Sequence, residues 1–149
     1  MKTIASFTVD HTVLEPGMYV SRVDGDITTY DLRTRKPNAG DFMDDSTMHS
    51  AEHMLATLLR NGELAEQIIY FGPMGCQTGF YLLVRGADNA RVLGVLKQAL
   101  RDTISYDGEI FGNSARECGN YLTLDLAKAK IECVRYLDIL EKIDGRMQY

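Results

Sequence analysis

Two histidines and a glutamate stand close together in the segment His49-Ser50-Ala51-Glu52-His53. On a helix, side chains four residues apart project from one face about one turn apart, so both imidazoles can reach one metal ion. Glu52 lies beside them, within reach of a metal-bound substrate or water. This H-x-x-E-H order is typical of a catalytic metal site. The alternative, from this motif alone, is that both histidines are ordinary helix residues.

Cys118 is the expected third ligand. It is followed by Gly119, which allows close approach of the backbone. Two histidines and a thiolate with an open fourth position match a catalytic site, and a thiolate favours zinc or iron(II) over magnesium or calcium. The alternative is that Cys118 is a small core residue.

Cys76 is the candidate acid–base group. It follows Gly72-Pro73-Met74-Gly75, a string that predicts a turn or loop because glycine and proline both interrupt strand pairing. A thiol there is expected to face a cleft, and a nearby metal or cation would favour its reactive thiolate form. The alternative is a buried small hydrophobe, which is the role expected for Cys133 beside the apolar stripe of the last helix.

The elements that must position these residues follow from the spacing of apolar side chains. Strands are predicted over residues 18–23 and 27–34, joined by a turn at 24–26 in a hairpin, and over 67–71 and 78–85. Helices are predicted from about residue 44 to residues 61–62, over 88–105, and over 124–143. Residues 1–16 and 108–119 read as mostly irregular. This order indicates an α+β fold, an antiparallel sheet covered by helices.

The predicted helices carry specific expectations. The first has Ser46 as its N-cap and one apolar face opposite the histidines. Apolar or small side chains at helical spacing in the other two are Val92, Leu96, Ala99 and Thr103, and then Leu124, Ala127, Ile131, Val134, Leu137 and Leu140.

Composition limits the class of protein. The chain has 149 residues, 45% of them hydrophobic and 25% charged, which fits one domain over residues 1–149. The net charge of -5 and the absence of a Lys/Arg-rich run argue against a nucleic-acid or anionic-membrane partner. No signal peptide or membrane-spanning segment is recognisable, so a cytoplasmic location is expected. Three widely spaced cysteines suggest ligand, nucleophile or packing roles rather than disulfides.

Taken together, these residues resemble the LuxS family of S-ribosylhomocysteine lyases. The resemblance covers essentially the whole chain. It is carried by Ser6-Phe7-Thr8-Val9-Asp10-His11, Asp31-Leu32-Arg33 with Pro37-Asn38, residues 49–56, Pro73-Met74-Gly75-Cys76-Gln77-Thr78-Gly79, and Cys118-Gly119.

The resemblance implies a LuxS/MPP-like metallohydrolase fold and an activity. That activity is cleavage of the thioether of S-ribosylhomocysteine to homocysteine and 4,5-dihydroxy-2,3-pentanedione, the precursor of autoinducer-2. It links quorum sensing to the methionine cycle. A Lewis-acid metal would assist two carbonyl shifts and a β-elimination. The expected metal is iron(II), one per subunit, with zinc or cobalt as substitutes.

The resemblance also assigns the residues. His49, His53 and Cys118 are the implied metal ligands, and Cys76 and Glu52 the acid–base pair. The implied substrate contacts are Ser6, His11 and Arg33. A homodimer with active sites at the subunit interface is implied as well.

Two other functions compete with this interpretation. An inverzincin-type metallopeptidase would take a carboxylate as third ligand, and Glu132 is the nearest candidate. A structural zinc module would use Cys76 as a fourth ligand, although such modules usually draw their ligands in close pairs such as C-x-x-C.

Overall fold

A four-stranded antiparallel sheet is the centre of the computed structural model, which describes residues 1–149. The strands are β1 (Gly17–Asp24), β2 (Ile27–Arg33), β3 (Ile68–Pro73) and β4 (Gly79–Arg85), and they lie in the order β1-β2-β4-β3. The β1–β2 hairpin closes as predicted, with Asp24 opposite Ile27 and Gly25 in the left-handed region at φ 63°.

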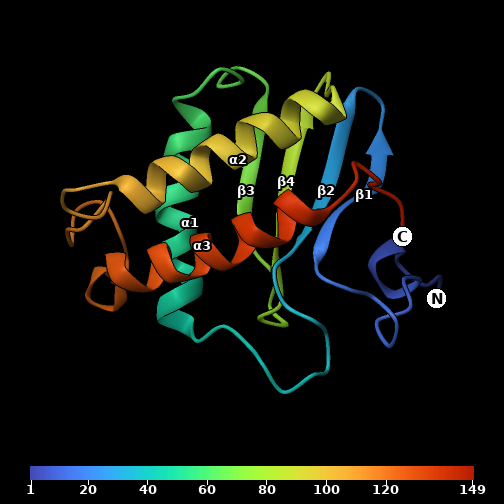
Figure 1. The fold of residues 1–149 in the computed structure, drawn as a ribbon, viewed down its shortest axis with the longest axis horizontal. Helices are drawn as coiled ribbons and strands as arrows, with labels where there is room; N and C mark the ends of the chain where they lie inside the picture. The colour runs from blue at the N-terminus through green and yellow to red at the C-terminus, as the bar shows by residue number, and fades with distance from the viewer.

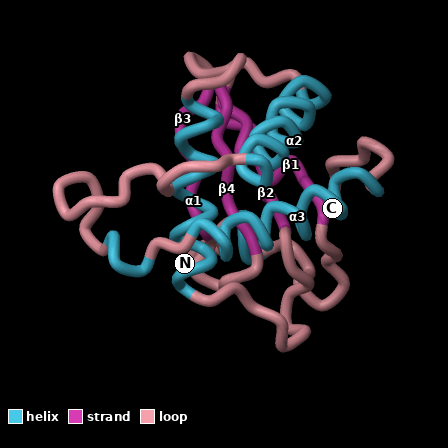
Figure 2. The backbone as a smooth tube through the Cα atoms, turned by 60° about the vertical axis from the view of Figure 1, so that its left-hand side comes forward, coloured by secondary structure: helices cyan, strands magenta, loops and turns pink.

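Three helices cover one face of this sheet (Figure 1). They are α1 (Asp45–Arg60), α2 (Asn89–Ser105) and α3 (Leu126–Lys142), with short 3-10 turns η1 (Ala5–Phe7) and η2 (Tyr121–Thr123). Figure 2 shows the strands and helices in adjoining layers, with the long connecting loops outside them. The predicted α+β architecture is therefore confirmed. None of the helices is long and apolar enough to cross a lipid bilayer.

Strand alternation decides what each face of the sheet carries. Tyr30 and Leu32 of β2 pair with Leu82 and Phe80 of β4, and all four are buried against the helices. The opposite face, which we call the open face, carries the residues of the other parity. These are Tyr19, Thr29, Asp31, Arg33, Tyr70, Tyr81 and Leu83. Asp31 and Arg33 are buried despite lying on this face.

Two expectations about α1 and β3 were wrong. The N-cap of α1 is Asp44, whose side chain accepts a hydrogen bond from the backbone N–H of Thr47, while the Ser46 hydroxyl donates to the carbonyl of Thr123. Gly72 and Pro73 were predicted to end the strand, yet both pair with β4. Pairing survives because β3 is an edge strand, where a backbone nitrogen that points away from the sheet needs no acceptor.

The predicted apolar stripe of α3 was wrong in part, although Leu140 is buried and Leu137 packs against the core. Ile131 and Val134 are 70% and 52% exposed, and the buried face contains Ala129, Cys133, Tyr136 and Leu140. Apolar spacing predicts the wrong face here because α3 points some polar groups into the core, where they form hydrogen bonds with other parts of the chain. The Tyr136 hydroxyl donates to the carbonyl of Gly17, for example. Cys133 packs in the core as expected, and the predicted inner residues of α2 are all buried.

Candidate metal centre and active site

The structure brings His49, His53 and Cys118 together. The two histidines come from successive turns of α1, and Cys118 comes from the loop after α2, 69 residues beyond His49. One ligand atom from each lies within 4.8 Å of the others, and Nε2 of His49 is 3.3 Å from Sγ of Cys118. Three donors are thus grouped where sequence spacing alone could link only two.

Outer hydrogen bonds orient both imidazoles. Nδ1 of His53 lies 2.8 Å from the carbonyl of Phe111, which can only accept, so that nitrogen carries the proton. Nδ1 of His49 lies 2.7 Å from the hydroxyl of Thr123, and this hydroxyl donates to the carbonyl of Asn120. The same tautomer is therefore assigned to His49. Both Nε2 atoms are left free to bind a metal, as metal-ligating histidines require.

Close packing and burial complete this centre. Gly112 has φ +70°, and a Cβ there would lie 2.9 Å from Nδ1 of His53, so the loop can approach the imidazole only as glycine. The backbone N–H of Asn120 points to the sulfur of Cys118 at 3.4 Å.

Burial and the neighbouring His53 lower the pKa of His49, although Glu52 opposes them. A neutral imidazole is the form that binds a metal.

These residues fit a transition metal. Two imidazole nitrogens and one thiolate form the donor set of catalytic zinc and related sites, with one position open. The outer hydrogen bonds are also of the kind found at such sites. Magnesium and calcium fit poorly because they prefer oxygen ligands.

Glu52 lies at the edge of this cluster. Its Oε2 is 3.8 Å from Nε2 of His53, and its side chain is 30% exposed. A carboxylate in this place can exchange protons with a bound molecule without being a ligand itself.

A second cluster surrounds Cys76. A cleft of about 490 Å³ is lined by Ser6, His11, Arg33 and Cys76. These residues come from the N-terminal segment, from β2 and from the turn before β4. Cys76 is exposed, as predicted for a thiol that faces a cleft. The four residues were expected to serve one substrate, and the structure does place them around one space.

Arg33 holds Cys76 in a polar network. Nη1 of Arg33 lies 3.7 Å from Sγ of Cys76 and 2.7 Å from the hydroxyl of Thr78, which is itself 3.1 Å from that sulfur. Nη2 of Arg33 pairs with Asp31 at 2.6 Å. This network places a buried positive charge beside the sulfur of Cys76.

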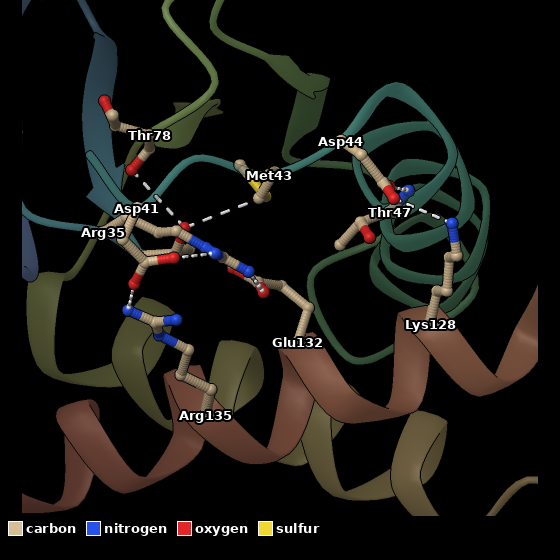
Figure 3. Close-up of polar contacts among 10 residues, drawn as sticks. Arg35, Asp41, Met43, Asp44, Thr47, Thr78, Lys128, Glu132 and Arg135 are labelled. Atoms are coloured by element: carbon tan, nitrogen blue, oxygen red, sulfur yellow. Dashed lines mark hydrogen bonds and ion pairs between the residues drawn. The ribbon is translucent and has the colours of Figure 1, made fainter.

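The Cys76 cleft and the His49–His53–Cys118 cluster share no residue within one chain. Cys76 is thus not part of the cluster that could hold a metal, contrary to the structural zinc alternative. Glu132 is absent from that cluster as well. Its carboxylate is bound by Arg35, which itself also pairs with Asp41 (Figure 3). The metallopeptidase alternative therefore loses its third ligand.

Sequence reasoning gave no role to several residues that support the site. Asp31 and Thr78 are buried and bonded to Arg33, and Thr123 bonds to His49. One signal was available for Asp31. Residues two apart in a strand share a face, so a charged pair at 31 and 33 is expected to meet. Thr123 could not be found this way because its contact spans 74 residues.

Comparison with known proteins decides the family. Residues 4–146 match the family model described as S-Ribosylhomocysteinase (LuxS). The chain belongs to the LuxS family. A LuxS relative named S-ribosylhomocysteine lyase from Borreliella afzelii (strain PKo) is 44% identical over 149 residues, covering 96% of this chain and 95% of that protein.

Two further LuxS relatives carry the same name. The one from Clostridium acetobutylicum is 43% identical over 156 residues, covering 100% of this chain and 99% of that protein. The one from Desulfotalea psychrophila is 45% identical over 150 residues, covering 96% and 94%. The likeness to these LuxS proteins thus extends over the cleft, the metal cluster and the helices between them.

Proposed function

We propose that this chain is a carbon–sulfur lyase that cleaves S-ribosylhomocysteine to homocysteine and 4,5-dihydroxy-2,3-pentanedione, the precursor of autoinducer-2. The observation that carries the proposal is the cleft in which Ser6, His11, Arg33 and Cys76 meet, in a chain that also groups two imidazoles with a thiolate. The family and the names of the relatives supply the substrate.

Cys76 is the proposed base and acid at carbon. The ring-opened substrate carries an aldehyde at C1, and removal of the C2 proton with its return at C1 moves the carbonyl to C2. A second exchange moves it to C3. The Cys76 thiolate takes and returns these protons, and Arg33, 3.7 Å away, stabilises its negative charge.

Glu52 is the proposed partner base. Once the ketone is at C3, the C4 proton is acidic, and its removal expels the sulfur from C5 as the homocysteine thiolate, which then takes a proton. Glu52 takes the C4 proton and moves protons among the sugar oxygens. No electron acceptor is needed, because the two carbonyl shifts and the elimination leave the overall oxidation state unchanged. Ser6 and His11 would hold the substrate at the mouth of the cleft.

His49, His53 and Cys118 are the proposed ligands of one metal ion per subunit. The ion would supply Lewis-acid polarisation of the sugar carbonyl. We propose iron(II), with zinc or cobalt as substitutes, because the mixed nitrogen and sulfur donor set suits all three.

A homodimer with active sites between subunits is part of the proposal. Its support is that the Cys76 cleft and the metal cluster share no residue within a chain, while the mechanism needs both. The open face of the sheet also exposes apolar surface. Tyr70 there is 48% exposed, and Tyr81 and Leu83 are only partly covered. A cytoplasmic role in recycling homocysteine and in quorum sensing follows from the same proposal.

The function and the dimer are tested together by mixing inactive variants. Cys76→Ala and Glu52→Gln protein should each fail to release a thiol from S-ribosylhomocysteine. After the two are unfolded and refolded together, mixed dimers contain one intact site, and thiol release should return to about a quarter of the wild-type rate, because half of random dimers are mixed and each has one of two sites. No recovery, with wild type active after the same treatment, would contradict a shared site.

A further inference from the structure

The segment after α3, residues 143–149, returns along the edge strand β1 (Figure 1). The backbone N–H of Val20 donates to the carbonyl of Met147, whose side chain is buried in the main core. The ring of Tyr149 stacks on Tyr19 with centroids 5.0 Å apart. These contacts bring Tyr149 to the open face of the sheet, where Asp31 lies.

Tyr149 forms a hydrogen bond with a buried carboxylate. Its hydroxyl donates to Oδ2 of Asp31 at 2.8 Å, and the same oxygen pairs with Nη2 of Arg33 at 2.6 Å. Oδ1 of Asp31 and Nε of Arg33 are buried with no hydrogen-bond partner. The orientation of the Asp31–Arg33 pair therefore depends on a single oxygen, and Tyr149 holds that oxygen from outside the strand.

The contacts continue to the thiol. The other end of the Arg33 guanidinium, Nη1, reaches the hydroxyl of Thr78 and the sulfur of Cys76. A continuous chain of polar contacts thus runs from Tyr149 through Asp31 and Arg33 to Cys76. A hollow of about 890 Å³ lies beside residues 145–149, the C-terminal segment at which these contacts begin.

We propose that Tyr149 is a positioning residue for Cys76, acting through Asp31 and Arg33. The proposal rests on the function proposed above in assigning the acid–base role to Cys76. Its physical basis is charge. A hydrogen bond from Tyr149 disperses the negative charge of Asp31, and without it that charge opposes thiolate formation on the other side of the Arg33 guanidinium. The other titratable groups facing this thiol are Arg33, His11 of the N-terminal segment and Tyr81 of β4.

The electrostatics of the tyrosine agree with this placement. Burial raises the pKa of Tyr149, and the nearby Asp31 charge raises it further. The phenol therefore stays protonated and able to donate at neutral pH.

The test is Tyr149→Phe, which removes the hydroxyl and keeps the stacked ring. The matched control is Tyr30→Phe, the same change at a tyrosine of β2 on the core face of the sheet, whose hydroxyl donates to Asn89. Alkylation of Cys76 by iodoacetamide is followed against pH by mass spectrometry of its peptide. We expect Tyr149→Phe to slow alkylation at pH 7 by roughly three- to tenfold, part of the effect of one hydrogen bond to a charged group. The midpoint of the profile should move to higher pH, and kcat should fall more than KM rises.

Tyr30→Phe should behave as wild type in both measurements. A Tyr149→Phe profile that superimposes on wild type would overturn the proposal. Asp31→Asn gives a second check, because the hydroxyl acts through Asp31, and adding Tyr149→Phe to it should change alkylation no further. If Tyr149→Phe slowed alkylation as much in the Asp31→Asn background as in wild type, the proposal that Tyr149 acts through Asp31 would also be refuted. Alkylation needs no substrate, so a chain that failed to cleave S-ribosylhomocysteine would defeat the proposed function without deciding this inference.

Discussion

The guanidinium of Arg33 lies between the carboxylate of Asp31, at 2.6 Å, and the sulfur of Cys76, at 3.7 Å. Arg33 and Asp31 are 2% and 1% exposed, on a face of the sheet that no helix covers. One cation thus compensates a buried anion and lies beside the thiol to which we assign the acid–base role. Stability and reactivity are coupled at this position, and the first prediction concerns that coupling.

Replacing Arg33 should destabilise the fold. Arg33→Gln leaves Asp31 as a buried charge without its partner, and removal of one member of a buried pair costs about 3–5 kcal/mol. Urea denaturation followed by circular dichroism measures this cost. The control is Arg22→Gln, since Arg22 pairs with Asp24 at an exposed position and its loss should cost far less stability. If Arg33→Gln lost as little stability as Arg22→Gln, Arg33 would not be structurally important.

Removing Cys118 should remove the metal. Cys118→Ala leaves only two imidazole ligands, and we expect metal content per chain, measured by atomic emission, to fall by at least tenfold. Cys133→Ala is the matched control, because Cys133 is buried in the core, away from the cluster, and its loss should leave metal content unchanged. Full metal retention in Cys118→Ala would refute its assignment as a ligand.

Cys76→Ala and Glu52→Gln should keep the fold and the metal while turnover falls. Each positioned acid–base group is worth about 10²–10⁴ in rate. Thiol release from S-ribosylhomocysteine measures turnover, and metal analysis with circular dichroism confirms that the protein is intact. Turnover within threefold of wild type in either variant would remove that residue from the mechanism.

The loop between β2 and α1 should depend on α3. Arg35, near the start of this loop, is bound by Glu132, and Asp41 further along it pairs with Arg35 and Arg135 (Figure 3). The same loop supplies Phe42 to the wall of the Cys76 cleft. Glu132→Gln should therefore lower stability by about 3 kcal/mol and raise KM more than it lowers kcat.

The control for this loop is Lys128→Met. Lys128 also joins α3 to the start of α1, but its pair with Asp44 is exposed. Its removal should leave both stability and KM nearly unchanged, because exposed ion pairs contribute little. If both variants changed KM by the same factor, the buried Arg35–Glu132 pair would not determine the position of the loop in the cleft.

Alkaline pH should weaken the fold through Cys133. Burial raises the pKa of this thiol from its ordinary value of 9.0 to about 12. Below pH 9 the thiol is protonated in folded and unfolded chains alike, so its full contribution to the free energy of unfolding is present. That contribution is lost as pH rises toward 12, because the unfolded chain ionises first. The slope is about 1.4 kcal/mol per pH unit for one proton.

Urea unfolding at half-unit steps from pH 8 to 10 checks this prediction. Wild type should lose stability faster than Cys133→Ala above pH 9, whatever the lower starting stability of the variant. The buried Tyr30, whose pKa burial raises to about 12, contributes in both proteins and only above pH 10. Parallel curves would mean that the thiol ionises without unfolding the chain.

Local patterns predicted most of the fold. Apolar runs bounded by turn residues located the four strands, and helical spacing located the three helices to within a few residues. The failures have physical causes outside local spacing. Pro73 stays in a strand only because that strand has an unpaired edge, and Ile131 is exposed because polar partners distant in sequence turn α3. Neither fact can be read from the neighbouring residues.

The site divides in the same way. The histidines four apart on a helix are a local signal, and their meeting was predictable. The position of Cys118 depends on how the loop after α2 folds back, and the contact of Tyr149 with Asp31 spans 118 residues. Such contacts are decided by tertiary packing, so only the resemblance or the structure could reveal them.

The most direct measurement is product analysis by mass spectrometry after metal-loaded protein is incubated with S-ribosylhomocysteine. The account predicts homocysteine and 4,5-dihydroxy-2,3-pentanedione in equal amounts, with neither formed by Cys76→Ala. Substrate recovered intact from folded, metal-loaded wild type would contradict it.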